Sequence, residues 1–245
     1  MAGWLAIFKR ELISYFATPV ALVFLVVFLV LSGAFTFYLG DFFLRDQADL
    51  QSFFVYHPWL FLFLIPAVSM RLWAEDRRSG TFELLLTLPI STFAIVMGKF
   101  LAAWVFTGLA LLLTCPIWIT VSDLGAPDHG VIFAGYVASF LMAGSYLSIG
   151  AALSALTKNQ IIAFVGTAVI CFLFMASGLP LVQNLFVGWA PDALVSLVAS
   201  FSFFSHFNGI LRGVIEGRDL LFFLSLISFW LFVNYVFVNL KREAG

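Results

Sequence analysis

The chain has 245 residues, of which 63% are hydrophobic and 10% are charged, and its mean hydropathy is +1.09. This balance excludes an ordinary soluble domain and indicates an integral membrane protein. The formal net charge is −1 and the sequence has no long run of Lys or Arg, so nothing points to nucleic acid as a partner.

Residues 1–18 are expected to form an interfacial helix. Apolar side chains recur there at helical spacing between Trp4 and Phe16, and Pro19 is expected to break the helix. The alternative is that this segment extends the first membrane span. No small-residue cleavage site of a signal peptide follows the charges around Lys9, so the first apolar run is kept as a span.

Uncharged stretches long enough to cross a bilayer predict six transmembrane helices, since a span needs about 20 residues. Spans 1 and 2 are expected within residues 19–73, spans 3 to 5 within 98–182, and span 6 at 219–240. The individual spans are expected at about 19–38, 50–70, 99–123, 131–156, 160–182 and 219–240. The fold class is therefore all-α, with the whole chain, 1–245, forming one transmembrane domain.

Residues 183–218 are predicted to be an extracytoplasmic segment with a re-entrant or surface-lying helical part, and not a seventh span. The part from Ala193 to Leu211 is uncharged but unusually polar for a lipid-facing helix. With six spans and both termini in the cytoplasm, nine of the twelve Lys and Arg residues lie on the cytoplasmic side, which agrees with the positive-inside rule. The other three, Arg45, Arg212 and Arg218, lie outside.

A short charged and amphipathic segment, residues 74–90, separates spans 2 and 3 and is expected to form a surface helix. Gly80 and Thr81 are suited to begin it, Glu83 favours its first turn, and Pro89 ends it. Two faces follow from helical spacing. One face is expected to carry Phe82, Leu85, Leu86 and Pro89, and the adjacent face Thr81, Leu84 and Leu88.

The run from Glu75 to Pro89, EDRRSGTFELLLTLP, closely resembles the cytoplasmic coupling-helix motif of type-2 ABC transporter permeases, in particular short permeases of the gliding-motility and nitrous-oxide-reductase-maturation type. The resemblance implies that this helix docks on a separate ATPase. The docking residues that it implies are Glu75, Asp76, Arg77, Arg78, Gly80, Thr81, Glu83, Leu84, Leu88 and Pro89. From the residues alone, an amphipathic connector with arginines at the lipid headgroups remains the alternative. The polar stretch before span 6, from Phe204 to Val214, also resembles the end of a hairpin in that family.

The sequence contains none of the common catalytic or nucleotide-binding motifs. Without a Gly-x-x-x-x-Gly-Lys-Ser/Thr loop, the chain is not expected to bind ATP itself. Cys115 and Cys171 lie in apolar runs and are interpreted as small buried side chains, with no disulfide or metal site. His57, His129 and His206 are interpreted as interfacial polar residues at the outer edges of the helices.

Small residues recur four positions apart in the fourth span, which permits close approach of helices in lipid. They are Gly135, Ser139 and Ala143, and then Gly144, Ser148 and Ala152. Packing inside one subunit is favoured over a dimer seam. The spans hold almost no ionisable groups, which argues against an ion-coupled carrier and suits an amphipathic cargo or the transmission of force.

These patterns and the resemblance together predict the membrane-spanning permease of a type-2 ABC exporter, not an enzyme, in the bacterial inner (cytoplasmic) membrane. The implied partners are two copies of a cytosolic ATPase carrying ATP and magnesium, a second permease as homo- or heterodimer, and the lipid bilayer. The family also allows an extracytoplasmic auxiliary protein, which the acidic outer residues Asp41, Asp46 and Asp49 neither support nor oppose. The alternatives are a membrane scaffold that transports nothing and a passive channel, the latter disfavoured by the shortage of polar pore-lining residues.

Overall fold

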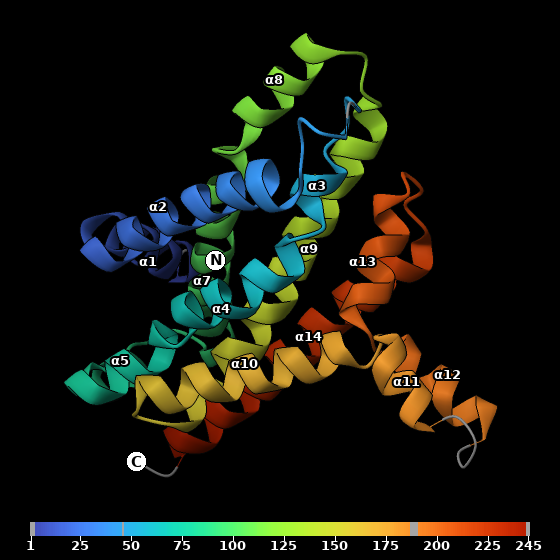
Figure 1. Ribbon diagram of the computed structural model, residues 1–245. Helices are drawn as coiled ribbons and strands as arrows, with labels where there is room; N and C mark the ends of the chain where they lie inside the picture. Colours follow the sequence, from blue (N-terminus) through green and yellow to red (C-terminus); the bar gives the residue numbers. More distant parts are fainter. Residues whose placement is uncertain (1–2, 46, 187–190, 244–245) are drawn as a thin grey trace.

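The computed structural model describes residues 3–45, 47–186 and 191–243, so Asp46 and residues 187–190 lie outside the description. All regular elements within these ranges are helices, which confirms the all-α membrane fold (Figure 1). The first half contains α1 Gly3–Ala17, α2 Pro19–Ala34, the π-helix η1 Phe35–Leu39, α3 Gln51–Phe54, α4 His57–Ser69, α5 Arg71–Ser79, α6 Thr81–Thr87 and α7 Thr92–Leu112. The second half contains α8 Cys115–Leu124, α9 His129–Leu156, α10 Gln160–Ala176, α11 Pro180–Phe186, α12 Asp192–Ser200, α13 Phe203–Leu211 and α14 Gly217–Glu243.

Among the described residues, five helical runs are long and apolar enough to cross a membrane. They are Ala21–Leu39, Gln51–Ser79, Thr92–Leu124, His129–Leu156 and Gly217–Glu243. The expected fifth span, 160–182, is shorter: α10 ends at Ala176, and Pro180 begins the separate helix α11. An added Cβ on Gly178, between these two helices, would lie 2.0 Å from Ser202 Oγ. The connection from α10 to α11 therefore packs closely against the residue that precedes α13. The count of six spans therefore stays a prediction.

The break expected at Thr18 and Pro19 is confirmed. Helix α1 ends at Ala17, and Pro19 is the first residue of α2. At this position a backbone N–H has no partner within the helix, so proline, which has none, costs no hydrogen bond. Helix α1 packs along α7. At the closest point, a Cβ on Gly98 would lie 2.9 Å from the side chain of Ile7. The first helix is therefore held against the third span and does not extend the first.

Helix α9 lies at the centre of the fold and packs against α4, α5, α7, α10, α13 and α14. The small residues of its four-residue repeats are all buried inside the chain, so the packing interpretation is confirmed. A Cβ on Gly150 would lie 1.9 Å from Ser69 Oγ, which shows how closely α9 and α4 approach. Cys171 on α10 is buried as expected, whereas Cys115 is only half-buried.

The segment before α14 is largely helical, as expected, with α11, α12 and α13 in succession. Helix α13 packs on α9 and α14, and its residues Phe203, Phe207 and Ile210 are fully buried. It is therefore a structural part of the core. Its placement on the outer side of the membrane remains a prediction.

The interpretation of the histidines as interfacial residues is wrong for two of the three. His57 is fully buried, with Nδ1 2.7 Å from Ser139 Oγ and Phe53 and Phe61 packed on its ring. His206 is also buried, with Nδ1 2.6 Å from Asp219 Oδ1. The polar partners of these two side chains lie on neighbouring helices. The spacing of residues within a single segment cannot predict such partners. His129 remains near the surface, where its Nδ1 accepts from Trp118 Nε1.

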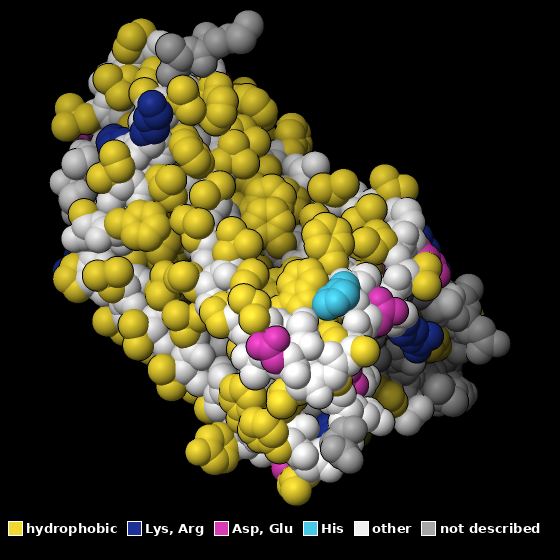
Figure 2. Space-filling view, turned by 90° about the horizontal axis from the view of Figure 1, so that it is seen from above, with side chains coloured by type: hydrophobic (Ala, Val, Ile, Leu, Met, Phe, Trp, Pro, Cys, Tyr) yellow, Lys and Arg dark blue, Asp and Glu magenta, His cyan; other side chains and the backbone are white. Residues whose placement is uncertain are grey.

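The outer surface of the helices is strongly apolar. Large hydrophobic side chains are exposed along α2, α10 and α14. Figure 2 shows one face of the molecule covered mostly by such side chains, with charged groups at a few places. In water, so large an apolar surface would be unfavourable, but it suits contact with lipid.

Candidate functional site

The charged segment between the second and third spans is built from two helices. Helix α5 continues the run that begins at Gln51, and it ends where Gly80 takes the left-handed conformation with φ of +77°. Helix α6 then begins at Thr81 and ends at Thr87, before Pro89. The expected helix over 74–90 is thus divided, because glycine adopts a positive φ without the penalty that a side chain brings.

The two faces expected of α6 agree with its burial. Phe82, Leu85 and Leu86 are buried, and Leu84 is 69% exposed. Thr81 and Leu88 are also exposed. Pro89 was expected on the same face as Phe82, Leu85 and Leu86, which are buried. It is exposed, because the helix has ended before it and helical spacing no longer applies. Helix α6 is therefore packed against the rest of the protein on one face and exposed on the other.

Helix α6 is attached to α5 mainly through aromatic packing. The rings of Phe82 and Trp73 meet nearly edge to face, with their centroids 5.9 Å apart. Trp73 is fully buried, and its backbone N–H donates to Ser154 Oγ on α9 at 3.0 Å. These contacts join α6 to α5 and, through Trp73, to the central helix α9.

A buried lysine joins three helices at this end of the molecule. Lys99 of α7 is 3% exposed, and its Nζ lies 2.7 Å from Asp76 Oδ2 and 3.0 Å from Glu11 Oε1. It also lies over the ring of Trp73, 5.2 Å from the centroid. The two carboxylates come from α5 and α1, so one charge ties both helices to the third span.

Two further cations cap the last turn of α9. Arg77 Nη1 donates to the carbonyl oxygen of Ala155 at 3.1 Å, and Lys241 Nζ donates to the same oxygen. The final carbonyls of a helix have no partners within it and carry a partial negative charge, which cations stabilise. Arg77 from α5 and Lys241 from α14 thus meet at the end of α9.

The ten residues implied by the resemblance divide into two groups in the structure. Asp76 and Arg77 point inward and hold α5 to its neighbours, while Glu75 pairs with Arg71 at 2.6 Å. The others lie around the turn at Gly80 or on the surface. These are Arg78, Gly80, Thr81, Glu83, Leu84, Leu88 and Pro89. Their docking role stays a prediction.

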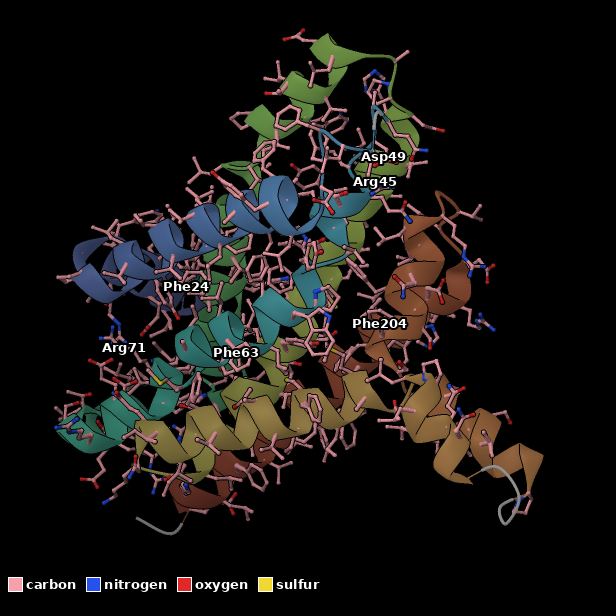
Figure 3. All side chains as sticks on the ribbon, in the orientation of Figure 1. Phe24, Arg45, Asp49, Phe63, Arg71 and Phe204 are labelled. Atoms are coloured by element: carbon pink, nitrogen blue, oxygen red, sulfur yellow. The ribbon has the colours of Figure 1, made fainter. Side chains whose placement is uncertain are left out.

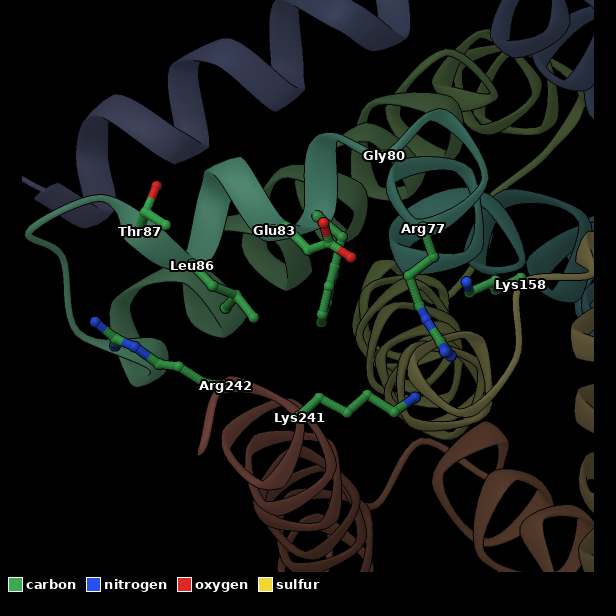
Figure 4. A pocket seen from close by; sticks show the side chains of 9 residues that line it. Arg77, Gly80, Glu83, Leu86, Thr87, Lys158, Lys241 and Arg242 are labelled. Atoms are coloured by element: carbon green, nitrogen blue, oxygen red, sulfur yellow. The ribbon is translucent and has the colours of Figure 1, made fainter. Parts of the chain in front are cut away.

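A groove of about 660 Å³ opens beside α6, between that helix, the end of α14 and the connection from α9 to α10 (Figure 4). Four cations line it, and Glu83 is its one acidic side chain. The lining residues are Arg77, Gly80, Phe82, Glu83, Leu86, Thr87, Lys158, Lys241 and Arg242. In Figure 4, α6 lies on one side of this groove and Lys241 and Arg242 on the other.

The opposite end of the helices carries a smaller polar group. Arg45 donates to Ser52 Oγ at 2.6 Å and lies 3.5 Å from Asp49, so this loop is held over the start of α3. Figure 3 places Arg45 and Asp49 at one end of the run from α3 to α5, and Arg71 toward its other end. This separation agrees with the two sides that the charge pattern predicts.

Sequence reasoning treated Lys99, Lys158, Lys241 and Arg242 only as markers of topology. The structure brings the last three together with Arg77 in one groove and places Lys99 in the core. For Lys99 the sequence did contain a clue. A single lysine inside an otherwise apolar span is energetically unfavourable unless it forms an ion pair, so a paired lysine could have been predicted. For the groove no signal was present, since its residues come from four separate segments.

Comparison with known proteins identifies relatives among membrane transport proteins. A family model described as ABC-2 family transporter protein matches residues 48–238. Heme exporter protein B of Rhodobacter capsulatus is 39% identical over 72 residues. That match covers 29% of this chain and 33% of the relative, so it spans about a third of the curated protein.

Proposed function

Because the chain belongs to the ABC-2 transporter family, we propose that it is the membrane-spanning permease of an exporter-like ABC transporter, driven by a separate cytosolic ATPase. One observation carries the proposal. Helix α6 leaves Leu84 69% exposed, although the other face of the helix is anchored in the fold. An exposed leucine on a short anchored helix beside membrane-length helices suits a protein partner better than it suits water.

The contacts of α6 offer a route for force. Docking on one face of α6 would move Phe82 against Trp73, and α5 belongs to the same helical run as the second span. Lys99 and Arg77 extend this contact to α1, α7 and α9. Closure of the ATPase on ATP would thus tilt several spans together between inward and outward states.

The expected assembly contains two permeases and two ATPases, with ATP and magnesium bound by the ATPases. The proposed location is the bacterial inner membrane with both termini in the cytoplasm. This is supported by the gathering of Arg77, Lys158, Lys241 and Arg242 at one end of the helices. The second permease is either a copy of this chain or a different one.

Heme is the first cargo to test, since the curated relative is named a heme exporter. The match covers only part of both chains, so the name of the relative serves only to choose the first cargo to test. No group of three His, Cys, Asp or Glu residues within the described ranges is arranged to hold a metal ion.

The function is tested by purifying the full chain from its native membrane in mild detergent and measuring ATP hydrolysis in the eluate. We expect a soluble subunit with a Gly-x-x-x-x-Gly-Lys-Ser/Thr loop to co-purify and hydrolyse ATP. Leu84→Asp should abolish this association, because a charge then replaces the exposed apolar contact. The matched control is Leu44→Asp, at a residue that is 84% exposed in the loop before α3, and it should co-purify normally.

Two results would contradict the proposal. If no such ATPase co-purifies, the chain is better described as a membrane scaffold. If the ATPase binds equally to the Leu84→Asp and Leu44→Asp variants, then α6 is not the docking helix, although the permease assignment survives.

A further inference from the structure

The groove beside α6 gathers positive charge that the protein itself does not neutralise. Lys99 and Arg71 both form ion pairs with carboxylates, but none of the four groove cations does so within the part of the chain that the structure describes. Glu83 lies in the same groove and is likewise outside any ion pair there. The four cations repel each other, and with only one carboxylate among them the groove attracts anions.

The four cations are not equivalent. Arg77 and Lys241 are occupied by the carbonyl of Ala155. Arg242 donates from Nη1 to the Ile90 carbonyl at 3.3 Å and to Thr92 Oγ1 at 3.1 Å, which leaves the rest of its guanidinium free to bind. Lys158 is exposed and has no hydrogen bond or ion pair to any described residue.

The position and the walls of the groove point to an amphiphile. Lys241 and Arg242 follow the apolar part of α14, and Lys158 lies between α9 and α10, so the cations are at the ends of membrane-length helices. This is the level of the lipid headgroups. Phe82 and Leu86 add an apolar wall. Beyond the groove, Leu240 of α14 and Ile161 of α10 are exposed and offer a surface for acyl chains.

We propose that the groove formed by α6, Lys158, Lys241 and Arg242 binds the phosphate headgroup of an anionic phospholipid. Figure 4 places Lys158 and Arg242 at opposite ends of the groove, so both charges would attract the headgroup and the nearer of the two would donate to the phosphate oxygens. A guanidinium fork and an ammonium group both suit this ligand. Basic pockets between helix ends are a common setting for anionic headgroups. A bound headgroup would neutralise the groove and hold α6 close to the end of α14.

The test uses the purified full chain in detergent and follows binding of phosphatidylglycerol by native mass spectrometry, with phosphatidylcholine as the neutral comparison. The variant K158Q/R242Q removes two groove charges but keeps Arg77 and Lys241, which cap α9. The control K9Q/R212Q removes two exposed charges that do not line the groove. We expect phosphatidylglycerol affinity to fall roughly 30-fold in K158Q/R242Q, from the usual contribution of a basic residue near an anionic lipid, and to stay unchanged in the control.

Three results would overturn the proposal. The first is equal affinity for the two lipids in the unmodified chain, and the second is an equal loss in both variants. The third is full displacement of phosphatidylglycerol by inorganic phosphate or by a polyglutamate peptide, which would assign the groove to a free anion or to an acidic protein segment. If K158Q/R242Q fails to fold, K158Q alone serves, because Lys158 is exposed and unpartnered among the described residues. No step requires an ATPase, so the result is independent of the proposed transport function.

Discussion

Asp76 of α5 lies with its Oδ2 2.7 Å from the Nζ of Lys99 in α7, in a part of the molecule where the lysine is almost completely buried. The resemblance implies that Asp76 is a docking residue, and that role stays a prediction. In the structure its carboxylate belongs to a cluster of three charged side chains, with Lys99 and Glu11 of α1. Part of the segment between the second and third spans therefore serves the fold, and the rest remains free to meet another protein.

Replacement of Lys99 should be strongly destabilising. In Lys99→Met, Glu11 and Asp76 lose the charge that compensates them, and we expect the free energy of unfolding to fall by about 3 kcal/mol. The measurement is unfolding of the full chain in mixed micelles. Lys9→Met, at an exposed lysine of α1, should change stability by less than about 0.5 kcal/mol. Adding Asp76→Asn to Lys99→Met should restore part of the loss, and no restoration would show that the ion pair does not matter.

The adjacent arginines Arg77 and Arg78 should behave differently. Arg77→Ala removes the bond to Ala155 and the contact with the Phe82 ring, so it should cost about 1.5 kcal/mol of stability. Arg78→Ala should leave stability within about 0.5 kcal/mol, because its side chain is exposed and forms no hydrogen bond or ion pair with a described residue. If Arg78 is a docking residue, its variant should instead bind the ATPase more weakly. Equal ATPase binding by Arg78→Ala and the unmodified chain would support the headgroup-anchor interpretation.

The turn at Gly80 should be sensitive to a side chain for conformational reasons alone. Gly80 has φ of +77°, and an added Cβ would meet nothing within 4 Å. Gly80→Ala should therefore cost about 1 kcal/mol through backbone strain without any clash. Gly33 in α2 has the same open space but no positive φ, so Gly33→Ala should be neutral or stabilising. Equal effects of the two substitutions on thermal unfolding would contradict this account.

Much of the site could be predicted from the sequence where its properties are local. The apolar spacing of α6 correctly separated Phe82, Leu85 and Leu86 from Leu84, because a helix repeats its faces at a constant period. The same rule failed for Pro89, because the rule holds only inside the helix and α6 ends at Thr87. Gly80 was correctly expected at a helix start, but the sequence did not show that the preceding residues belong to a separate helix, α5.

Other features depended on partners far away in the sequence. His57 and His206 have neighbours with polar side chains on other helices, so their burial could not be inferred from their own segments. The buried position of Lys99 likewise depends on carboxylates from α1 and α5. The polar segment after α10 was correctly expected to be helical, yet its close packing through Phe203 and Phe207 was not foreseen.

The sequence by itself determined that this chain is a helical membrane protein, roughly where its apolar helices lie, and which short segment resembles a coupling helix. These conclusions rest on length, hydropathy and helical period, which are properties of consecutive residues. Only the tertiary structure decided that Arg77 and Lys241 meet at the end of α9, and that α6 lies beside a basic groove. Such contacts follow from how closely the helices pack around α9, which is set by the combined shapes of many side chains and not by any one segment.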